Sequence, residues 1–300
     1  MKPETRSFYQ ESTQRVVDQI ATGLDQALDL EDLAAGACLS PFHFHRVFRG
    51  MVGETPVELL RRLRLERAAW QLGHTDRAVT EIAFDAGYET HEAFTRAFRA
   101  NYNASPSGFR RRKFRRVELP AACGVHFDPA GRVPSFIPRD SGGRTMQVEI
   151  KEKPELRAAA VRHVGPYNQI GEAFGRLDAI VRPAGLLKPD TQMIAIYHDD
   201  PESIPADQLR SDAAVTVSSD DAVPKGLSEQ RVPAGRYACT THVGPYEKLG
   251  DAWARFMGEW LPASGHRIGD GVSYEVYLNN PMNEPDKQKL KTEMCVPIAS

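Results

Sequence analysis

The chain has 300 residues, 41% of them hydrophobic and 26% charged, which is the composition of a globular protein with room for two domains. It has no apolar run approaching about 18 residues and begins with a polar segment, so we expect a cytoplasmic protein without a transmembrane helix, a secretion signal or a membrane partner. The four cysteines are scattered without C-x-x-C or Cys–His spacing, which favours reduced thiols and no metal site.

The small net charge of −2 conceals an uneven distribution. Residues 40–116 carry 15 basic and 8 acidic side chains, whereas residues 117–300 carry 20 basic and 25 acidic ones. A basic segment in an otherwise acidic protein is the expected place for a polyanion such as nucleic acid. A charged face exposed to water would give the same counts, so the motifs have to decide.

Residues 6–114 are predicted to be helical almost throughout, because apolar residues recur at intervals of three and four positions. Within them, SPFHFHRVFRGMVGETP (40–56) aligns with THEAFTRAFRANYNASP (90–106) at an offset of 50 residues. Each copy follows a short apolar helix and a tight turn, and each begins with a capping residue, Ser40 or Thr90. Helix, turn and capped second helix form a helix-turn-helix, which the sequence predicts twice.

The helical period separates two faces on each capped helix. The core face carries Phe44, Phe48, Phe94 and Phe98. The opposite face carries side chains that can contact base edges in a major groove: Phe42, His45, Arg46 and Arg49 in the first copy, and His91, Glu92, Thr95, Arg96 and Arg99 in the second. Basic runs at 61–67 and 110–116 are expected to contact phosphates.

These motifs resemble the AraC/XylS-type DNA-binding domain over residues 8–112, and we place the domain at 7–114. The resemblance implies that a long helix near 56–72 joins two units that read successive grooves of promoter DNA, with RNA polymerase as a further candidate partner. By motif position, the readers are Phe42, His45 and Arg46 in the first unit, and His91, Glu92, Thr95 and Arg96 in the second. Glu92 is acidic, so it must accept from a cytosine amino group or point away, and base contacts by the second unit stay open.

Residues 115–145 are rich in proline and glycine and show no sustained period. We therefore predict a linker, with a short strand at GVHF (124–127). His126 and Asp128 lie in this segment without a third ligand at a suitable spacing. We expect them to be polar loop residues and not metal ligands.

From residue 146 strands and helices occur twice in the same order. RHVGPYNQIGEAFGRL (162–177) aligns with THVGPYEKLGDAWARF (241–256) at an offset of 79 residues. The repeated HVGPY could be a paired catalytic site or one fold element used twice. We favour a strand-to-helix turn and expect no catalytic residue and no cofactor, because neither a nucleophile elbow nor a glycine-rich phosphate loop is present. The fold class is α+β, a duplicated β-α-β-β module with pseudo-twofold symmetry.

The two modules differ where MIAIYHDDP aligns with SYEVYLNNP, which sets Ala195 opposite Glu275. In a strand Glu275 shares a face with Tyr277, and a carboxylate among aromatic rings binds organic cations. A glutamate exposed to water is the alternative. The expected ligand-binding residues are Tyr167, Phe174, Tyr246, Trp253, Glu275 and Tyr277.

Residues 146–300 resemble the gyrase-inhibitor-like (GyrI-like) small-molecule-binding domain through HVGPY and YEVYLNNP. The resemblance implies a central cleft for amphipathic, often cationic, compounds, with Glu275 as its acidic residue. Together the two halves predict a one-component transcriptional regulator controlled by a small effector. We expect a monomer, because no dimerisation heptads are visible. Two alternatives stay open for this half: a hydrolase that uses Glu275 and a tyrosine as base and acid, or a protein-binding module.

Overall fold

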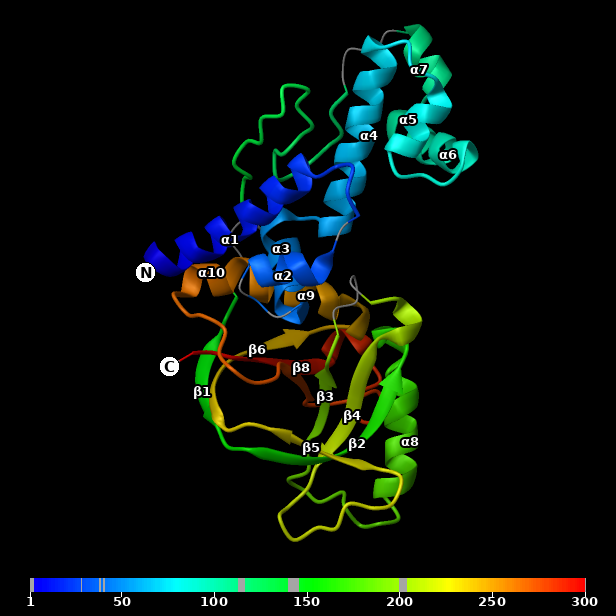
Figure 1. Cartoon of the computed structure of the whole chain (residues 1–300). Helices are drawn as coiled ribbons and strands as arrows, with labels where there is room; N and C mark the ends of the chain where they lie inside the picture. The colour runs from blue at the N-terminus through cyan, green and yellow to red at the C-terminus, as the bar shows by residue number, and fades with distance from the viewer. Residues whose placement is uncertain are drawn as a thin grey trace. The chain divides into compact units, whose positions relative to one another are not determined.

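The computed structural model describes residues 3–27, 29–37, 39, 41–112, 117–139, 146–199 and 204–299. Contacts divide the chain into two compact units (Figure 1). The helical unit consists of residues 8–40 and 47–140, and the sheet unit consists of residues 1–7, 41–46 and 141–300.

The N-terminal region is helical, as the spacing of its apolar residues predicts. The helices are α1 (Pro3–Thr22), α2 (Leu30–Gly36), α3 (Pro41–Val52), α4 (Pro56–His74), α5 (Val79–Asp85), α6 (His91–Tyr102) and α7 (Pro106–Arg112). The pairs α2–α3 and α5–α6 are the two helix-turn-helix motifs, and α4 is the long helix between them.

The starts of the helices follow from capping residues. The Thr55 hydroxyl accepts from the Glu58 N–H at 3.1 Å, and the Glu58 carboxylate accepts from the Thr55 N–H at 2.8 Å, which forms a capping box at the start of α4. Thr90 caps α6 by accepting from the Ala93 N–H. The other predicted cap, Ser40, lies outside the described residues.

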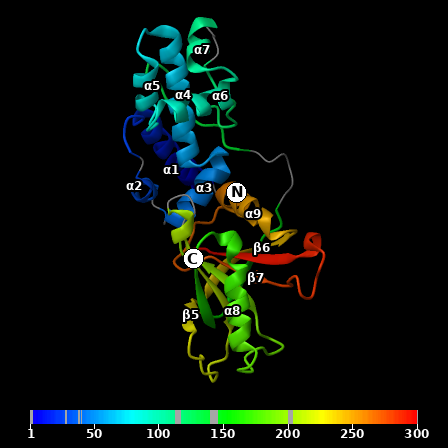
Figure 2. The same cartoon turned by 90° about the vertical axis from the view of Figure 1, so that its right-hand side faces the viewer.

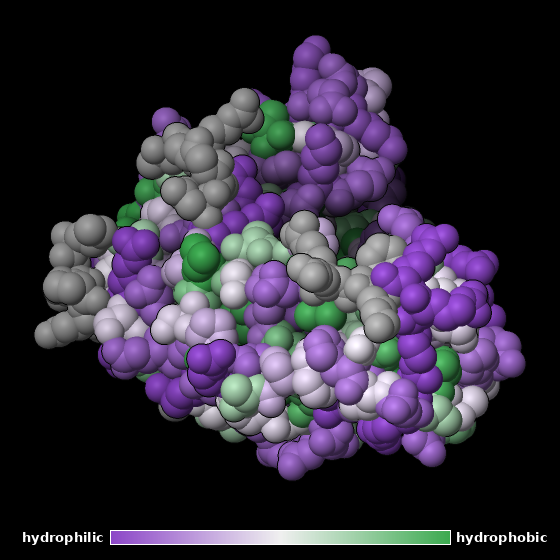
Figure 3. Space-filling model, turned by 90° about the horizontal axis from the view of Figure 1, so that it is seen from above, coloured by the Kyte–Doolittle hydropathy of each residue, from purple (hydrophilic) through white to green (hydrophobic). Residues whose placement is uncertain are grey.

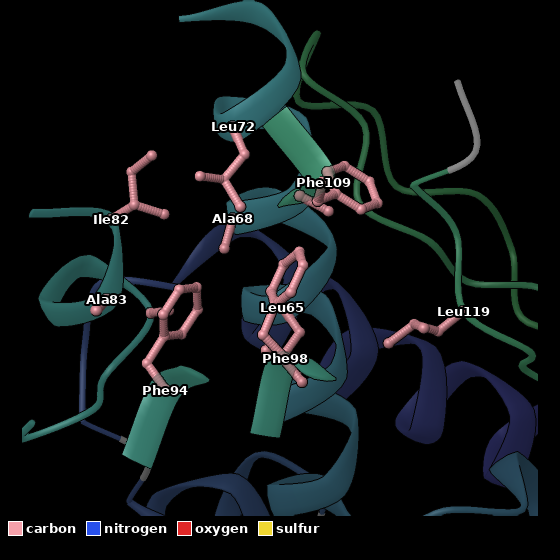
Figure 4. Close-up of a cluster of buried hydrophobic side chains, with 11 residues drawn as sticks. Leu65, Ala68, Leu72, Ile82, Ala83, Phe94, Phe98, Phe109 and Leu119 are labelled. Atoms are coloured by element: carbon pink, nitrogen blue, oxygen red, sulfur yellow. The ribbon is translucent and has the colours of Figure 1, made fainter. Parts of the chain in front are cut away.

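The second helix-turn-helix packs its phenylalanines into a core (Figure 4). The rings of Phe94 and Phe98 lie 5.4 Å apart, and Phe98 lies 5.3 Å from Phe109 of α7, edge to face. Phe44 and Phe48 of α3 are buried as well. The assignment of these four phenylalanines on α3 and α6 to the core is therefore confirmed.

The segment interpreted as a linker packs into the helical unit from residue 117 to 139. Its anchor is the fully buried Glu66 of α4, whose carboxylate accepts from the N–H groups of Leu119 and Phe127, both at 2.9 Å, and contacts the His126 ring at 3.0 Å. The predicted strand at 124–127 is wrong, because this backbone bonds to side chains of α4: the Phe127 N–H donates to Glu66, and the Val125 carbonyl accepts from Arg62. Asp128 pairs with Arg132.

The sheet unit contains an antiparallel sheet whose order is β1-β6-β8-β7-β3-β4-β2-β5. The strands are β1 (Glu149–Lys153), β2 (Leu156–Val164), β3 (Met193–Tyr197), β4 (Arg210–Thr216), β5 (Ser228–Val232), β6 (Gly235–Val243), β7 (Tyr274–Tyr277) and β8 (Lys291–Pro297). The sheet is strongly curled, and α8 (Gly171–Val181) packs along one face (Figure 1, Figure 2). The second module contains α9 (Leu249–Arg255), a π-helical turn (Phe256–Trp260) and α10 (Leu261–Ser264).

Each module has one strand more than predicted, so its order is β-β-α-β-β. Pro154 and Pro233 divide the first β-rich stretch of each module in two, because proline cannot donate to a ladder. The added strands pair outside their own module, β1 with β6 and β5 with β2. Each strand of the first module corresponds to one of the second: β1 to β5, β2 to β6, β3 to β7 and β4 to β8. When the corresponding strands are exchanged, the same order results, read from the opposite edge of the sheet. This order is compatible with the predicted pseudo-twofold relation.

On the face seen in Figure 3, hydrophobic residues lie in small groups among hydrophilic ones. The large exposed apolar side chains come from separate elements, among them Phe84, Ile137, Val164 and Met282. Among the described residues, no helix is both long and apolar enough to cross a membrane.

Candidate functional site

Glu275 lies near the middle of the sheet, on β7, where its side chain is only 1% exposed. The carboxylate receives three hydrogen bonds. Trp253 Nε1 donates to Oε1 at 2.6 Å, and the hydroxyls of Tyr197 and Tyr277 donate to Oε2 at 2.9 and 3.0 Å. The alternative of a glutamate exposed to water is therefore wrong.

The strand register explains how these groups meet. Ala195 of β3 pairs directly with Glu275 of β7, so the two positions that differ between the modules are neighbours in the sheet. Residues two apart on a strand point to the same face, which places Tyr197 and Tyr277 beside the carboxylate. The small Ala195 side chain leaves room there. Tyr197 was missed as a site residue, although its alignment with Tyr277 in the repeat was the signal for it.

Further aromatic rings surround the two tyrosines. Tyr167 lies 4.8 Å from Tyr197, and Phe174 and Tyr246 lie 5.2 and 5.3 Å from Tyr277, all edge to face. Together with Trp253 and Glu275 they form what we call the acid–aromatic cluster, which unites every residue predicted to bind the ligand: Tyr167, Phe174, Tyr246, Trp253, Glu275 and Tyr277.

The repeated HVGPY motif builds the turns that deliver Tyr167 and Tyr246 to the cluster. Gly165 and Gly244 adopt φ values of 139° and 141°, which side chains rarely tolerate. The Nε2 atoms of His163 and His242 lie 3.1 and 3.4 Å from the carbonyl oxygens of Pro166 and Pro245 in their own turns. These contacts support the structural interpretation of the motif.

The electrostatics of the cluster keep its tyrosines as donors. Burial, and then the negative charge of Glu275, raises the pKa of Tyr197 and Tyr277 well above the usual value, and the same two causes raise the pKa of Tyr246. The hydroxyls thus stay protonated at neutral pH. Three neutral donors satisfy the oxygens of the carboxylate without cancelling its negative charge.

A cation already lies on the indole of this cluster. Within the sheet unit, the Arg46 guanidinium is 4.4 Å from the centre of the Trp253 ring, which is a cation–π distance. Nearby, His43 Nε2 lies 3.0 Å from Ser273 Oγ, and burial followed by the charge of Arg46 lowers the pKa of His43 to about 4.

The residues predicted to read bases are placed differently on the two helices. On α6, His91, Glu92 and Arg96 are exposed and Thr95 is half-buried. On α3, His45 is only 3% exposed, Arg46 lies over Trp253, and the side chain of Phe42 is outside the described part. Glu92 lies in the first turn of α6, where the helix dipole favours an acidic side chain without any DNA contact.

Most arginines of the run at 61–67 are used inside the protein. Arg62 is buried and binds Glu54 at 2.6 Å and Glu66 at 3.1 Å, which makes it unavailable to a phosphate. Arg64 donates to backbone carbonyls, and Arg67 pairs with Asp25, whereas Arg61 is exposed. In the run at 110–116, Arg111 and Arg112 are exposed, and residues 113–116 lie outside the described part.

A double helix-turn-helix and a curled sheet with a buried acid among aromatic rings define a DNA-binding regulator with a small-molecule-binding domain. Residues 146–299 match the family model of the GyrI-like small molecule binding domain, and residues 33–112 match that of a helix-turn-helix domain. The chain belongs to the GyrI-like family, and its helix-turn-helix region is of the AraC type.

Individual proteins resemble one half each. A DNA gyrase inhibitor of Yersinia enterocolitica is 33% identical over 140 residues, which are 45% of this chain and 88% of the inhibitor. Regulatory protein SoxS of Salmonella typhimurium is 33% identical over 104 residues, which are 35% of this chain and 97% of SoxS. The crystal structure of the EcmrR C-terminal domain is 22% identical, covers 52% of this chain and 98% of that domain, and has a TM-score of 0.46.

Proposed function

We propose that the chain is a one-component transcriptional regulator, in which the helix-turn-helix motifs bind promoter DNA and the acid–aromatic cluster binds a small amphipathic cation. The observation that carries the second half is the Glu275 carboxylate, buried to 1% exposure and held by three neutral donors. The regulator acts as a cytoplasmic monomer, since two motifs in one chain suffice for two successive grooves.

The chemistry of the cluster selects the charge of its ligand. Burying a carboxylate costs free energy, which hydrogen bonds from Trp253, Tyr197 and Tyr277 offset in part. An organic cation with an apolar body can take the place of the Arg46 guanidinium near this charge and cover the rings at the same time. The guanidinium of Arg46 over Trp253 supports this preference, and a ligand cation would compete with it.

A ligand reaches Glu275 through the outer rings. Phe174, Tyr246 and Tyr277 are half-buried, and the first two each contact Tyr277, so one of the three has to move aside on binding. Two cavities of about 510 and 260 Å³ lie elsewhere, among residues of the helical unit. At the acid–aromatic cluster, the side chains pack ring against ring.

The same geometry argues against a hydrolase. A general base has to direct a carboxylate lone pair at the substrate, and three of the roughly four lone pairs of Glu275 already accept hydrogen bonds. In Glu275, Oε1 is engaged by the indole and Oε2 by two phenols. These contacts hold the carboxylate as a fixed charge, so we propose binding and not turnover.

The test joins the two halves in the full chain. A binding site is selected from random double-stranded DNA. Transcription in vitro from a promoter template that contains this site is then measured with and without phenyltrimethylammonium. We expect a sequence with two half-sites about one helical turn apart, and a change in transcript level for wild type but not for Glu275→Gln. A failure to select any sequence would contradict the regulator. An equal response of both proteins would remove Glu275 from the effector site.

A further inference from the structure

Two cysteines and three charged residues form a second cluster, which we call the thiol cluster. Cys239 of β6 and Cys295 of β8 have their Sγ atoms 3.3 Å apart, and both are buried. Cys295 pairs with Tyr274 on β7, whereas Met294 pairs with Glu275. Because alternate residues face opposite sides of a sheet, the thiols lie on the face away from the acid–aromatic cluster.

The backbone register allows a bond between the two sulfur atoms. Cys239 and Cys295 are directly paired between β6 and β8. In the same register, the Ile298 N–H donates to the Arg236 carbonyl and the Gly244 N–H donates to the Leu290 carbonyl. Hydrogen-bonded pairs alternate with non-hydrogen-bonded ones, so the cysteines occupy a non-hydrogen-bonded pair, with Cα atoms about 4.5 Å apart. A disulfide spans about 4.4–6.8 Å.

The hydrogen bond between the thiols, together with the charges beside them, gives the two sulfur atoms different roles. Lys151 and Lys153 of β1 bind the Glu293 carboxylate at 2.7 and 2.9 Å, next to Cys295. The hydrogen bond from Cys295 lowers the pKa of Cys239 against the effects of burial and of the Glu293 charge, and the lysine charges add a smaller lowering. The same pairing and burial raise the pKa of Cys295. Cys239 is therefore the nucleophile and Cys295 the thiol that completes the bond.

A metal ion is the competing occupant, since Cys239, Glu293 and Cys295 could offer ligands to one ion. The two ammonium groups argue against it. Each oxygen of Glu293 already binds one of them, so a divalent cation would meet two positive charges and a carboxylate that is in use. A disulfide, in contrast, needs no ligand from Glu293 and leaves both of its ion pairs intact.

We propose that Cys239 and Cys295 form a reversible disulfide when the protein meets a peroxide. The Cys239 thiolate attacks hydrogen peroxide and becomes a sulfenic acid, and the departing hydroxide takes up a proton to give water. The Cys295 sulfur then attacks Cys239, and its proton leaves with the sulfenic hydroxyl as a second water. Two thiols are oxidised and one peroxide is reduced. Lys151, 38% exposed, and Lys153, 20% exposed, connect the cluster to solvent.

The bond would constrain much of the second module. It closes a loop of 56 residues, and this loop carries Tyr246, Trp253 and Glu275. Cross-linking a loop of this size stabilises the folded state, chiefly by restricting the unfolded chain. We expect the oxidised sheet unit to unfold about 5 °C or more above the reduced one.

The main measurement of the test is made on the full-length wild-type protein. The reduced protein is exposed to hydrogen peroxide, its remaining thiols are alkylated, and the digest is analysed by mass spectrometry without reductant. We expect a peptide linking residue 239 to residue 295, which dithiothreitol removes, and the rise in unfolding temperature. The matched control Cys123→Ala, a buried cysteine of the helical unit, keeps the link, whereas Cys239→Ala and Cys295→Ala lose it.

Three results would overturn the proposal. In the first, peroxide leaves both cysteines free to be alkylated after denaturation. In the second, Cys239 is oxidised to the sulfinic acid without any linked peptide. In the third, wild type binds one equivalent of Zn²⁺, measured with a chromogenic chelator, and Cys239→Ala does not, which would assign the cluster to a metal.

Discussion

Trp253 Nε1 donates a hydrogen bond of 2.6 Å to Glu275 Oε1. The bond joins α9 to β7 and so links the helix and the hairpin of the second module. The first module has Phe174 and Ala195 at the corresponding positions, neither of which can take part in such a bond. The duplicated module therefore supplies the helix and strands of the site, and the presence of Trp253 and Glu275 in place of Phe and Ala makes the second copy a charged site.

Trp253→Phe keeps a ring in place and removes the N–H donor. We expect the free energy of unfolding of the sheet unit to fall by about 1–3 kcal/mol, because a buried carboxylate loses a hydrogen bond. The affinity for phenyltrimethylammonium should fall as well, since Phe attracts cations less strongly than Trp. Thermal unfolding and calorimetry measure the two effects. The control Trp260→Phe, whose ring stacks on His266, should show neither, and equal behaviour of the two variants would contradict the role given to the indole.

Arg96→Ala tests base contacts by α6, on which Arg96 is exposed. We expect affinity for the selected site to fall by about 1–3 kcal/mol, while affinity for random DNA and the salt dependence of binding stay nearly constant. A phosphate contact would instead lower the salt slope by about one. Arg182→Ala, which changes an exposed arginine directly after α8, is the control in gel retardation, and unchanged binding by Arg96→Ala would refute the assignment.

Glu66→Gln tests the anchor that holds residues 117–139 on α4. Glu66 accepts hydrogen bonds from two backbone N–H groups and forms an ion pair with Arg62. We therefore expect the free energy of unfolding of the helical unit to fall by about 3 kcal/mol in Glu66→Gln. Limited proteolysis should then cut within 117–139. Glu81→Gln, which alters an exposed ion pair with Arg77, should leave both measurements unchanged. If Glu66→Gln is as stable and as resistant to proteolysis as wild type, the segment is held in another way.

The pH dependence of stability follows from Asp212, a buried residue of β4. Burial acts to raise its pKa, but hydrogen bonds from His198 and Arg162 outweigh burial and hold the pKa below its usual value. A carboxyl whose pKa is lower in the folded state stabilises the protein above the unfolded-state pKa of about 3.9, and this contribution is lost as the pH falls through the folded-state pKa. Asp212→Asn should therefore unfold at lower urea concentration than wild type at pH 7, with the difference shrinking as the pH falls below about 4. The exposed Asp220 provides the control, Asp220→Asn, and a constant difference at all pH values would contradict this linkage.

Local sequence patterns predicted the elements and much of the cluster, because period and capping are local properties. The four phenylalanines of α3 and α6, the cap at Thr90 and the divergence at Glu275 were all visible in the chain. The pairing of β1 with β6 and of β5 with β2 was not, since any strand edge can serve as a partner and the choice depends on distant residues.

Buried polar groups were the second limit. Arg62 and Glu66 look like exposed charges of a basic helix, yet each is buried and satisfied by residues far along the chain. Tyr197 was absent from the predicted site for the same reason, because its role depends on a buried hydrogen bond to Glu275. A sequence pattern shows which side chains share a face, but not which of them are enclosed.

The central claim is that the buried charge of Glu275 recognises a cation, and isothermal titration with two ligands of the same shape tests it most directly. Phenyltrimethylammonium carries a positive charge, and tert-butylbenzene is its neutral counterpart. We predict that wild type binds the cation at least tenfold more tightly than the neutral ligand, and that Glu275→Gln removes this preference while Glu152→Gln, an exposed control, retains it. Equal affinities of wild type and Glu275→Gln for the cation would contradict the account.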